Sequence, residues 1–207
     1  MTAPVTIENL EMRIAELETL TRRKTFSEQL TRTLFHISDA VNTFPDLDRI
    51  LPFIHQALDQ IIGLPNCYIT VLNPEDGSVS IPFCVCENVD PDNPGTELFD
   101  TGELTRLTLE QGRPVILDQE DLKQIFPSPV PLPAVWMAIP LIQREKPIGT
   151  FAVFHNTDPD AFGQKEMDIL STVSHQVTLA IERKQSFDEL SLVKNYLANI
   201  INAMPSI

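Results

Sequence analysis

The sequence contains few cysteines and few basic residues, and it has no long apolar run. Its 207 residues include three cysteines, and 29 Asp and Glu outnumber 15 Lys and Arg, which gives a net charge of −14. An odd cysteine count in an acidic chain of this size does not indicate a disulfide framework. Nucleic-acid backbones are bound by clusters of Lys and Arg, and acidic residues outnumber basic ones here, so we expect no nucleic-acid partner.

No apolar stretch approaches the roughly 20 residues that cross a bilayer. The first ten residues include Glu8 and lack the basic-then-apolar pattern of a secretory signal. We therefore expect a cytoplasmic chain without membrane contact. His36, His55 and His155 have no Cys, His or paired carboxylate at metal-ligand spacing, so we predict no metal and no cofactor.

The first 34 residues have the pattern of a coiled-coil helix. Apolar residues recur at alternating spacings of three and four, and the predicted helix spans residues 6–32; the seam residues are Ile7, Leu10, Ile14, Leu17 and Thr21. A narrow apolar stripe on a single helix has only a partner helix to pack against. The pattern therefore predicts a parallel homodimer.

The middle of the chain alternates between helical and strand-like periodicity. Asp46 or Asp48 can cap a second helix, and Gly63 ends it. The predicted elements are helices at 47–62 and 101–111, a helical segment at 118–125, strands at 67–72, 79–86, 114–117, 135–142 and 147–155, and a long helix at 164–202. Strands arranged as hairpins predict an antiparallel sheet and hence an α+β fold.

Two neighbouring strands carry the most specific motif. Residues 136–142, Trp-Met-Ala-Ile-Pro-Leu-Ile, are followed after a polar turn by residues 147–153, Pro-Ile-Gly-Thr-Phe-Ala-Val. We expect Pro140 at a bulge or a strand edge, and Gly149 where the strand backbone crowds against a helix. This pairing resembles the GAF family of small-molecule sensory domains, and the resemblance covers residues 35–184.

The resemblance implies an antiparallel sheet with helices on both faces, flanked by long N- and C-terminal signalling helices. It also implies a ligand cavity between residues 99–135 and the facing strands. The apolar side chains predicted to line this cavity are Phe83, Phe99, Val135, Trp136 and Phe151. An alternative is that these residues form a filled core.

The C-terminal residues resemble the entry to a PAS domain. Residues 195–207 end a helix in a Met-Pro step, so residues 185–207 are expected to be a linker helix leading into a truncated PAS domain. This arrangement is typical of modular sensors of two-component systems. We expect the parent protein to be a sensor histidine kinase, or a cyclic-dinucleotide synthase.

The chain itself is then expected to be a sensor and not an enzyme. It would bind an unidentified small molecule and relay a signal through dimeric helices to a downstream output domain. The predicted dimer contacts are Phe26, Leu30, Leu34, Val173, Ala180 and Phe187. A second interpretation is an architectural domain that dimerises and binds no ligand.

Four further functions each require particular residues, which can be compared with this sequence. Cyclic-nucleotide binders carry Lys where Thr157 stands and an acid where Met167 stands, and bilin binders carry a Cys-His pair that is absent here. His175 lacks the residues that follow a phosphoacceptor histidine, which favours a structural role. A free methionine sulfoxide reductase would need nucleophilic cysteines; Cys84 and Cys86 are close in sequence, but two residues apart on a strand they are not expected to meet disulfide geometry.

Overall fold

A computed structural model describes residues 7–44, 46–73, 76–87, 101–126 and 132–203. The elements follow in the order α1 (Ile7–Thr43), α2 (Leu47–Ile62), β1 (Asn66–Leu72), β2 (Val79–Val85), α3 (Thr101–Gln111), β3 (Val115–Asp118), α4 (Gln119–Ile125), β4 (Val135–Gln143), β5 (Lys146–His155) and α5 (Gln164–Ala203). Residues 1–36 and 37–207 form two separate compact units, and each is described by itself.

The predicted elements are confirmed to within a few residues, with one helix longer than expected. The first helix continues from the predicted end at residue 32 to Thr43. Its pattern already offers apolar residues at Leu34 and Ile37, and no glycine or proline interrupts it before Pro45. Asp46 caps α2 by accepting a hydrogen bond from the Asp48 amide at 3.1 Å, and Gly63 ends it with φ of 62°.

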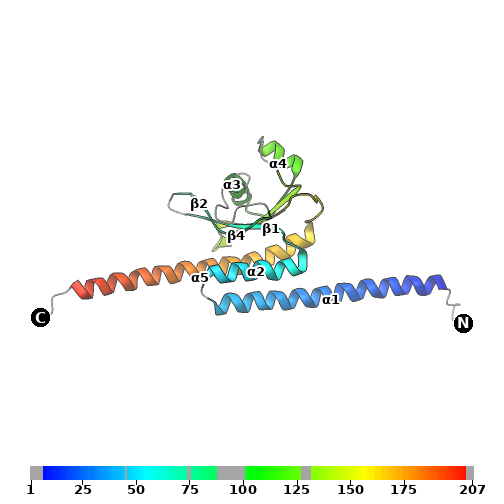
Figure 1. Ribbon diagram of the computed structural model, residues 1–207, viewed down its shortest axis with the longest axis horizontal. Coiled ribbons are helices and arrows are strands. Elements are labelled where there is room, and N and C mark those ends of the chain that lie inside the picture. Colours follow the sequence, from blue (N-terminus) through cyan, green and yellow to red (C-terminus); the bar gives the residue numbers. More distant parts are fainter. Residues whose placement is uncertain (1–6, 45, 74–75, 88–100, 127–131, 204–207) are drawn as a thin grey trace. The chain divides into compact units, whose positions relative to one another are not determined.

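The five strands form one antiparallel sheet in the order β2-β1-β5-β4-β3. Helices α3 and α4 cover one face, and α2 and α5 lie on the other (Figure 1). We refer to these as the α3/α4 face and the α2/α5 face. The expected α+β fold, with its long N-terminal and C-terminal helices, is therefore confirmed.

The central strands are buried on both faces. In β4, every residue from Val135 to Leu141 is buried, and in β5 the same holds from Gly149 to Phe154. Continuous burial explains why these segments are apolar runs without alternation. Among the described residues, no helix is long and apolar enough to cross a membrane.

Pro140 lies where its missing amide does no harm. It pairs with Thr150 of β5 on one side, whereas β3 pairs with β4 only as far as Ala138 on the other. The register shifts between Leu141 and Ile142, immediately after the proline. The predicted position at a bulge or an edge is confirmed.

Gly149 lies at the closest approach between β5 and β1. A Cβ atom there would lie 1.9 Å from the Thr70 carbonyl oxygen, which belongs to the backbone of β1. The expected crowding is real, but its source is wrong: a neighbouring strand, not a helix, requires the glycine.

Replacing Gly149 with alanine should lower the free energy of unfolding by about 3 kcal/mol, because the two strand backbones must separate to admit a methyl group. Chemical denaturation measures this change. Gly163→Ala is the matched control, since a Cβ at residue 163 meets no atom closer than 3.7 Å, and it should cost below about 1 kcal/mol. Equal effects of both substitutions would contradict the account of Gly149.

Candidate functional site

The α3/α4 face is built around a buried tyrosine–tryptophan pair. The Trp136 Nε1–H donates a hydrogen bond to the Tyr68 hydroxyl oxygen at 2.9 Å, and both side chains have no exposed surface. The pair joins β4 to β1 across the intervening strand β5. The buried residues packed with it are Leu104, Val115, Leu122, Phe126, Ala138, Ala152 and Phe154. We call this buried cluster the floor of the α3/α4 face.

Three buried threonines connect α3 to this floor. The hydroxyl groups of Thr70 and Thr150 are 2.7 Å apart, and the Thr105 hydroxyl of α3 donates to the Thr70 oxygen at 3.2 Å. The Thr150 amide also donates to the Thr70 hydroxyl oxygen, at 3.1 Å. Because each hydroxyl has a partner, burying the cluster carries little penalty and fixes the position of α3 over the sheet.

Two cysteines and an asparagine lie at the β2 end of the same face. The Sγ atoms of Cys84 and Cys86 are 3.0 Å apart, and both thiols are partly exposed. Just beyond them, the Glu87 amide donates to Oδ1 of the buried Asn66 at 2.8 Å. The Nδ2 group of Asn66 has no hydrogen-bond partner within the described part of the chain. The sequence did not predict the sulfur contact, because Cys86 lies one residue past the end of β2.

Burial and hydrogen bonding set the acidity of these groups. Burial raises the pKa of the Tyr68 hydroxyl above its ordinary value, although the hydrogen bond from Trp136 opposes this shift. The Cys84 pKa is lowered because its thiolate accepts a hydrogen bond from Cys86, and that same bond raises the Cys86 pKa. Burial also raises the pKa of Cys67, which has no exposed surface. Cys84 is thus the thiol of the three that ionises most readily.

The structure divides the predicted ligand-lining residues between the two faces. Trp136 lies on the α3/α4 face, and Phe83 contacts His55 of α2 with ring centroids 6.0 Å apart, which puts it on the opposite face. Phe151 pairs with Ile69, the same residue that pairs with Phe83, so it shares that face. Val135 alternates with Trp136 and also points away from the α3/α4 face. Phe99 lies outside the described residues. The described members of the set therefore do not meet in one cavity.

Two predicted dimer contacts are corrected by their burial. Val173 is 0% and Ala180 2% exposed within a single chain, because this half of α5 packs on the sheet. They are not available to a second subunit. Phe26, Leu30 and Leu34 are partly exposed, and Phe187 is 55% exposed. His175, expected to be structural, lies on the exposed side of α5.

Helix α5 of the α2/α5 face is hydrogen-bonded to the end of α1. The Arg183 guanidinium of α5 donates a hydrogen bond to the Val41 carbonyl oxygen in the last turn of α1. A cation near the C-terminus of a helix also interacts favourably with its dipole. Arg144 of the β4–β5 turn lies 3.7 Å from Glu182, a weak surface ion pair. Through Arg183, α5 is therefore attached to the first residues of the unit that spans residues 37–207.

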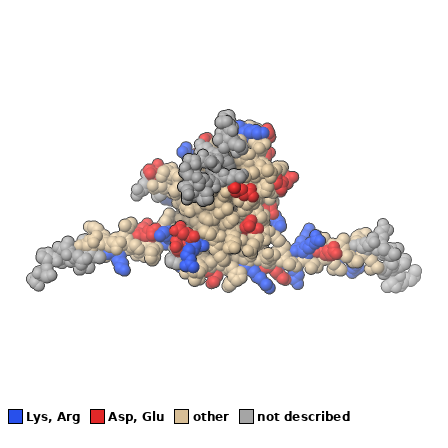
Figure 2. All heavy atoms as spheres, in the orientation of Figure 1, with Lys and Arg blue, Asp and Glu red and all other residues tan. Residues whose placement is uncertain are grey.

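The face of the molecule drawn in Figure 2 shows how the charged side chains are distributed. Acidic and basic side chains are interspersed on the face shown in Figure 2, with no broad blue patch over the described part of the sheet domain. Within the described ranges, no three His, Cys, Asp or Glu side chains gather as a metal-ligand set.

Comparison with known proteins assigns the family. The model of the GAF domain family matches residues 45–182, well over half of the chain. This chain belongs to the GAF domain family. No curated protein matches it by sequence.

Solved structures show the same fold at low identity. A GAF domain of a phosphoenolpyruvate-protein phosphotransferase from Coxiella burnetii is 16% identical with a TM-score of 0.62, covering 78% of this chain and 98% of that one. The GAF domain of a putative sensor histidine kinase from Pseudomonas syringae pv. tomato is 12% identical (TM-score 0.58; 83% and 99% covered). A free methionine-R-sulfoxide reductase from Neisseria meningitidis is 13% identical (TM-score 0.57; 76% and 90% covered). These neighbours thus include GAF domains of a phosphotransferase and of a putative sensor histidine kinase, and a free methionine-R-sulfoxide reductase.

Tyr68→Phe should lower the free energy of unfolding at neutral pH by about 1–3 kcal/mol, because it leaves the buried Trp136 indole N–H without an acceptor. The substitution should also reduce the decrease in the free energy of unfolding that the wild type shows as the pH rises into the alkaline range. The folded pKa of Tyr68 is raised above its ordinary 10.0, so its contribution is fully present below pH 10.0 and is lost as the pH rises further.

Urea unfolding between pH 7 and 11 checks both effects. Tyr196→Phe is the matched control: Tyr196 is the other of the two tyrosines and is 68% exposed, so its loss should change neither quantity. An unchanged alkaline slope in Tyr68→Phe would contradict the role given to burial of this hydroxyl.

Proposed function

We propose that this chain is a sensory GAF domain that binds a small molecule on the α3/α4 face. The signal passes through dimeric terminal helices and a following PAS domain to a downstream output domain, most simply that of a sensor histidine kinase. The observation that carries the proposal is the division of the sheet into two faces. One face holds the floor built around Tyr68 and Trp136, with α3 and α4 above it, and the other holds the helix that leaves the domain.

The C-terminal helix supports the relay because it extends far past the body that it covers. Among the residues of α5 whose burial the structure describes, the last buried one is Ile181, whereas the helix ends at Ala203. Beyond Ile181 the helix carries a set of largely exposed apolar side chains: Phe187, Leu190, Leu192, Val193, Tyr196 and Leu197. Of these, Leu190, Val193 and Leu197 repeat at spacings of three and four and form a seam that fits a second copy of the helix.

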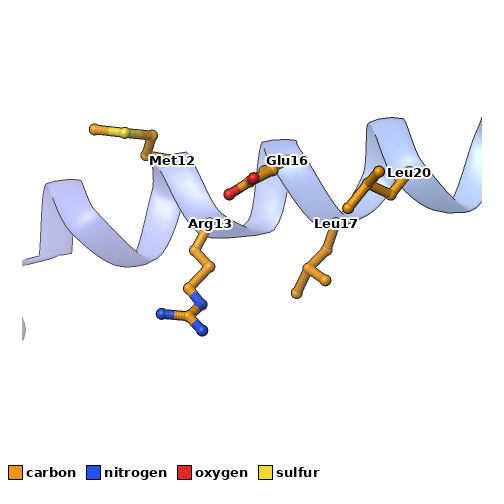
Figure 3. Close-up of a pocket in the computed structure, with 5 residues that line it drawn as sticks. All are labelled: Met12, Arg13, Glu16, Leu17 and Leu20. Atoms are coloured by element: carbon orange, nitrogen blue, oxygen red, sulfur yellow. The ribbon is translucent and has the colours of Figure 1, made fainter.

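The N-terminal helix carries a similar unburied seam. Leu10, Ile14 and Leu17 follow the coiled-coil spacing and are each about half exposed or more, at 49%, 55% and 57%. A hollow of about 300 Å³ lies beside this stretch and is lined by Met12, Arg13, Glu16, Leu17 and Leu20 (Figure 3). All five come from the same helix, so the hollow is a groove between its side chains, which a partner helix would fill, and not a ligand cavity.

Native mass spectrometry tests the ligand. The purified chain should appear as a dimer carrying a small added mass that is absent from the denatured spectrum. A dimer without added mass, whose melting temperature no compound of a small-molecule panel raises, would contradict ligand binding and support the architectural alternative. Ligand binding to the native state alone must stabilise it, so the melting temperature reports on weak ligands too.

Leu190→Glu should weaken dimerisation at least ~10-fold, equivalent to about 1.4 kcal/mol, because it puts a charge into the apolar seam of α5. Leu192→Glu is the matched control. Leu192 is as exposed as Leu190, at 70%, but it lies outside the seam, about 130° around the helix from the seam's centre. Light scattering behind size exclusion measures both; a monomeric wild type, or equal effects of the two variants, would contradict the helical dimer.

The chain should form no methionine from free methionine sulfoxide in the presence of dithiothreitol. Attack on a sulfoxide requires a thiolate, which a nearby positive charge stabilises, and no Lys, Arg or His lies within four residues of Cys84 or Cys86. Amino-acid analysis measures the product. Release of methionine that is lost in Cys84→Ser would assign the chain as a reductase instead of a sensor.

A further inference from the structure

The contact between Cys84 and Cys86 is not used by the proposed sensor function. Their sulfurs are 3.0 Å apart, and a disulfide bond needs about 2.05 Å. In an extended strand, the Cα atoms of residues i and i+2 are about 6.6 Å apart, which is near the upper limit for a disulfide. Cys86 lies beyond the last residue of β2, so the strand ladder no longer holds it at that spacing.

Hydrogen bonding next to the pair holds this geometry. The Glu87 amide donates to Asn66 Oδ1 at 2.8 Å, while Cys84 pairs with Tyr68 in the ladder between β1 and β2. Strand β1 therefore fixes the chain on both sides of Cys86. Cys84 and Cys86 also pack against the cluster that contains Tyr68 and Trp136. The two sulfurs are thus brought together by the fold and are not a chance approach of mobile side chains.

The third cysteine has none of these properties. Cys67 pairs with Val85 and Val153, which places it on the α2/α5 face, and it has no exposed surface. Cys84 and Cys86 are both partly exposed. An oxidant in solution therefore reaches the pair and not Cys67.

We propose that Cys84 and Cys86 form a redox-active dithiol, which a peroxide oxidises to an intrachain disulfide at the edge of the α3/α4 face. In the first step the Cys84 thiolate attacks a peroxide oxygen. A sulfur–oxygen bond forms, the oxygen–oxygen bond breaks, and the released alkoxide or hydroxide takes up a proton.

In the second step Cys86 resolves the sulfenic acid. Its sulfur attacks the Cys84 sulfur, the sulfur–sulfur bond forms, and the sulfur–oxygen bond breaks. The departing hydroxide takes the Cys86 thiol proton and leaves as water. The sum is two thiols and one peroxide giving one disulfide, one alcohol or water, and one water. Cys84 is held in β2 by its pairing with Tyr68 and lies 3.0 Å from the Cys86 sulfur, and the hydrogen bond between the two thiols lowers the Cys84 pKa, so we assign Cys84 as the nucleophile.

The test treats the fully reduced 207-residue chain with equimolar hydrogen peroxide and then labels free thiols in denaturant. The number of labelled thiols should fall from three to one, and the intact mass before labelling should fall by two hydrogen atoms. Cleavage after Glu75 and Glu87 separates Cys67 from the pair. The remaining label should lie on Cys67, and thiol treatment should restore all three.

Variants assign the two roles and control for folding. Cys86→Ser should accumulate a sulfenic acid on Cys84 that dimedone traps, Cys84→Ser should accumulate none, and Cys67→Ala should still form the disulfide. Three labelled thiols after oxidation, a disulfide that includes Cys67, or a disulfide between two chains would each overturn the proposal. The wild-type labelling pattern decides the matter even if a variant does not fold.

Discussion

The structure depends on one constraint: the central strands of the sheet are buried on both faces. A sheet with two apolar faces must be covered by helices on each, and this chain supplies α3 and α4 for one face and α2 and α5 for the other. The two coverings differ in kind. The α3/α4 face is covered by two short helices. The α2/α5 face is covered in part by α5, which runs well beyond the sheet. Under the proposed function, a change in packing on one face would be transmitted to the other through these closely packed strands.

Several close contacts join the central strands of the sheet. The Trp136–Tyr68 hydrogen bond spans three strands, and the Thr70–Thr150 contact joins two of them next to Gly149, where no side chain fits. Arg183 then connects the far face to the last turn of α1. The same arrangement places Cys84 and Cys86 at the rim of the floor, so that a disulfide there would alter the face on which we propose that the ligand binds.

Most of the fold could be predicted from local sequence signals, and most of the site could not. Asp46, Gly63 and the two hairpins set element boundaries through interactions within a few residues, which a sequence displays directly. The side of the sheet on which Phe83 or Phe151 lies depends on strand register and on which helix covers that side. Both residues are apolar and in doubly buried strands, so hydrophobicity carries no information about the face. The sulfur contact was missed for a similar reason: it depends on where β2 ends, and element ends are the least certain feature of a sequence pattern.

The central claim is that the two faces are coupled, and hydrogen exchange of the backbone amides tests it most directly. The chain would be measured as purified and again after unfolding, removal of small molecules and refolding. The account predicts that removal lowers protection on α3 and also in α5 around Arg183 and beyond, together with the last turn of α1. A loss of protection confined to the α3/α4 face, with α5 unchanged, would contradict the claim that this sheet relays what binds to it.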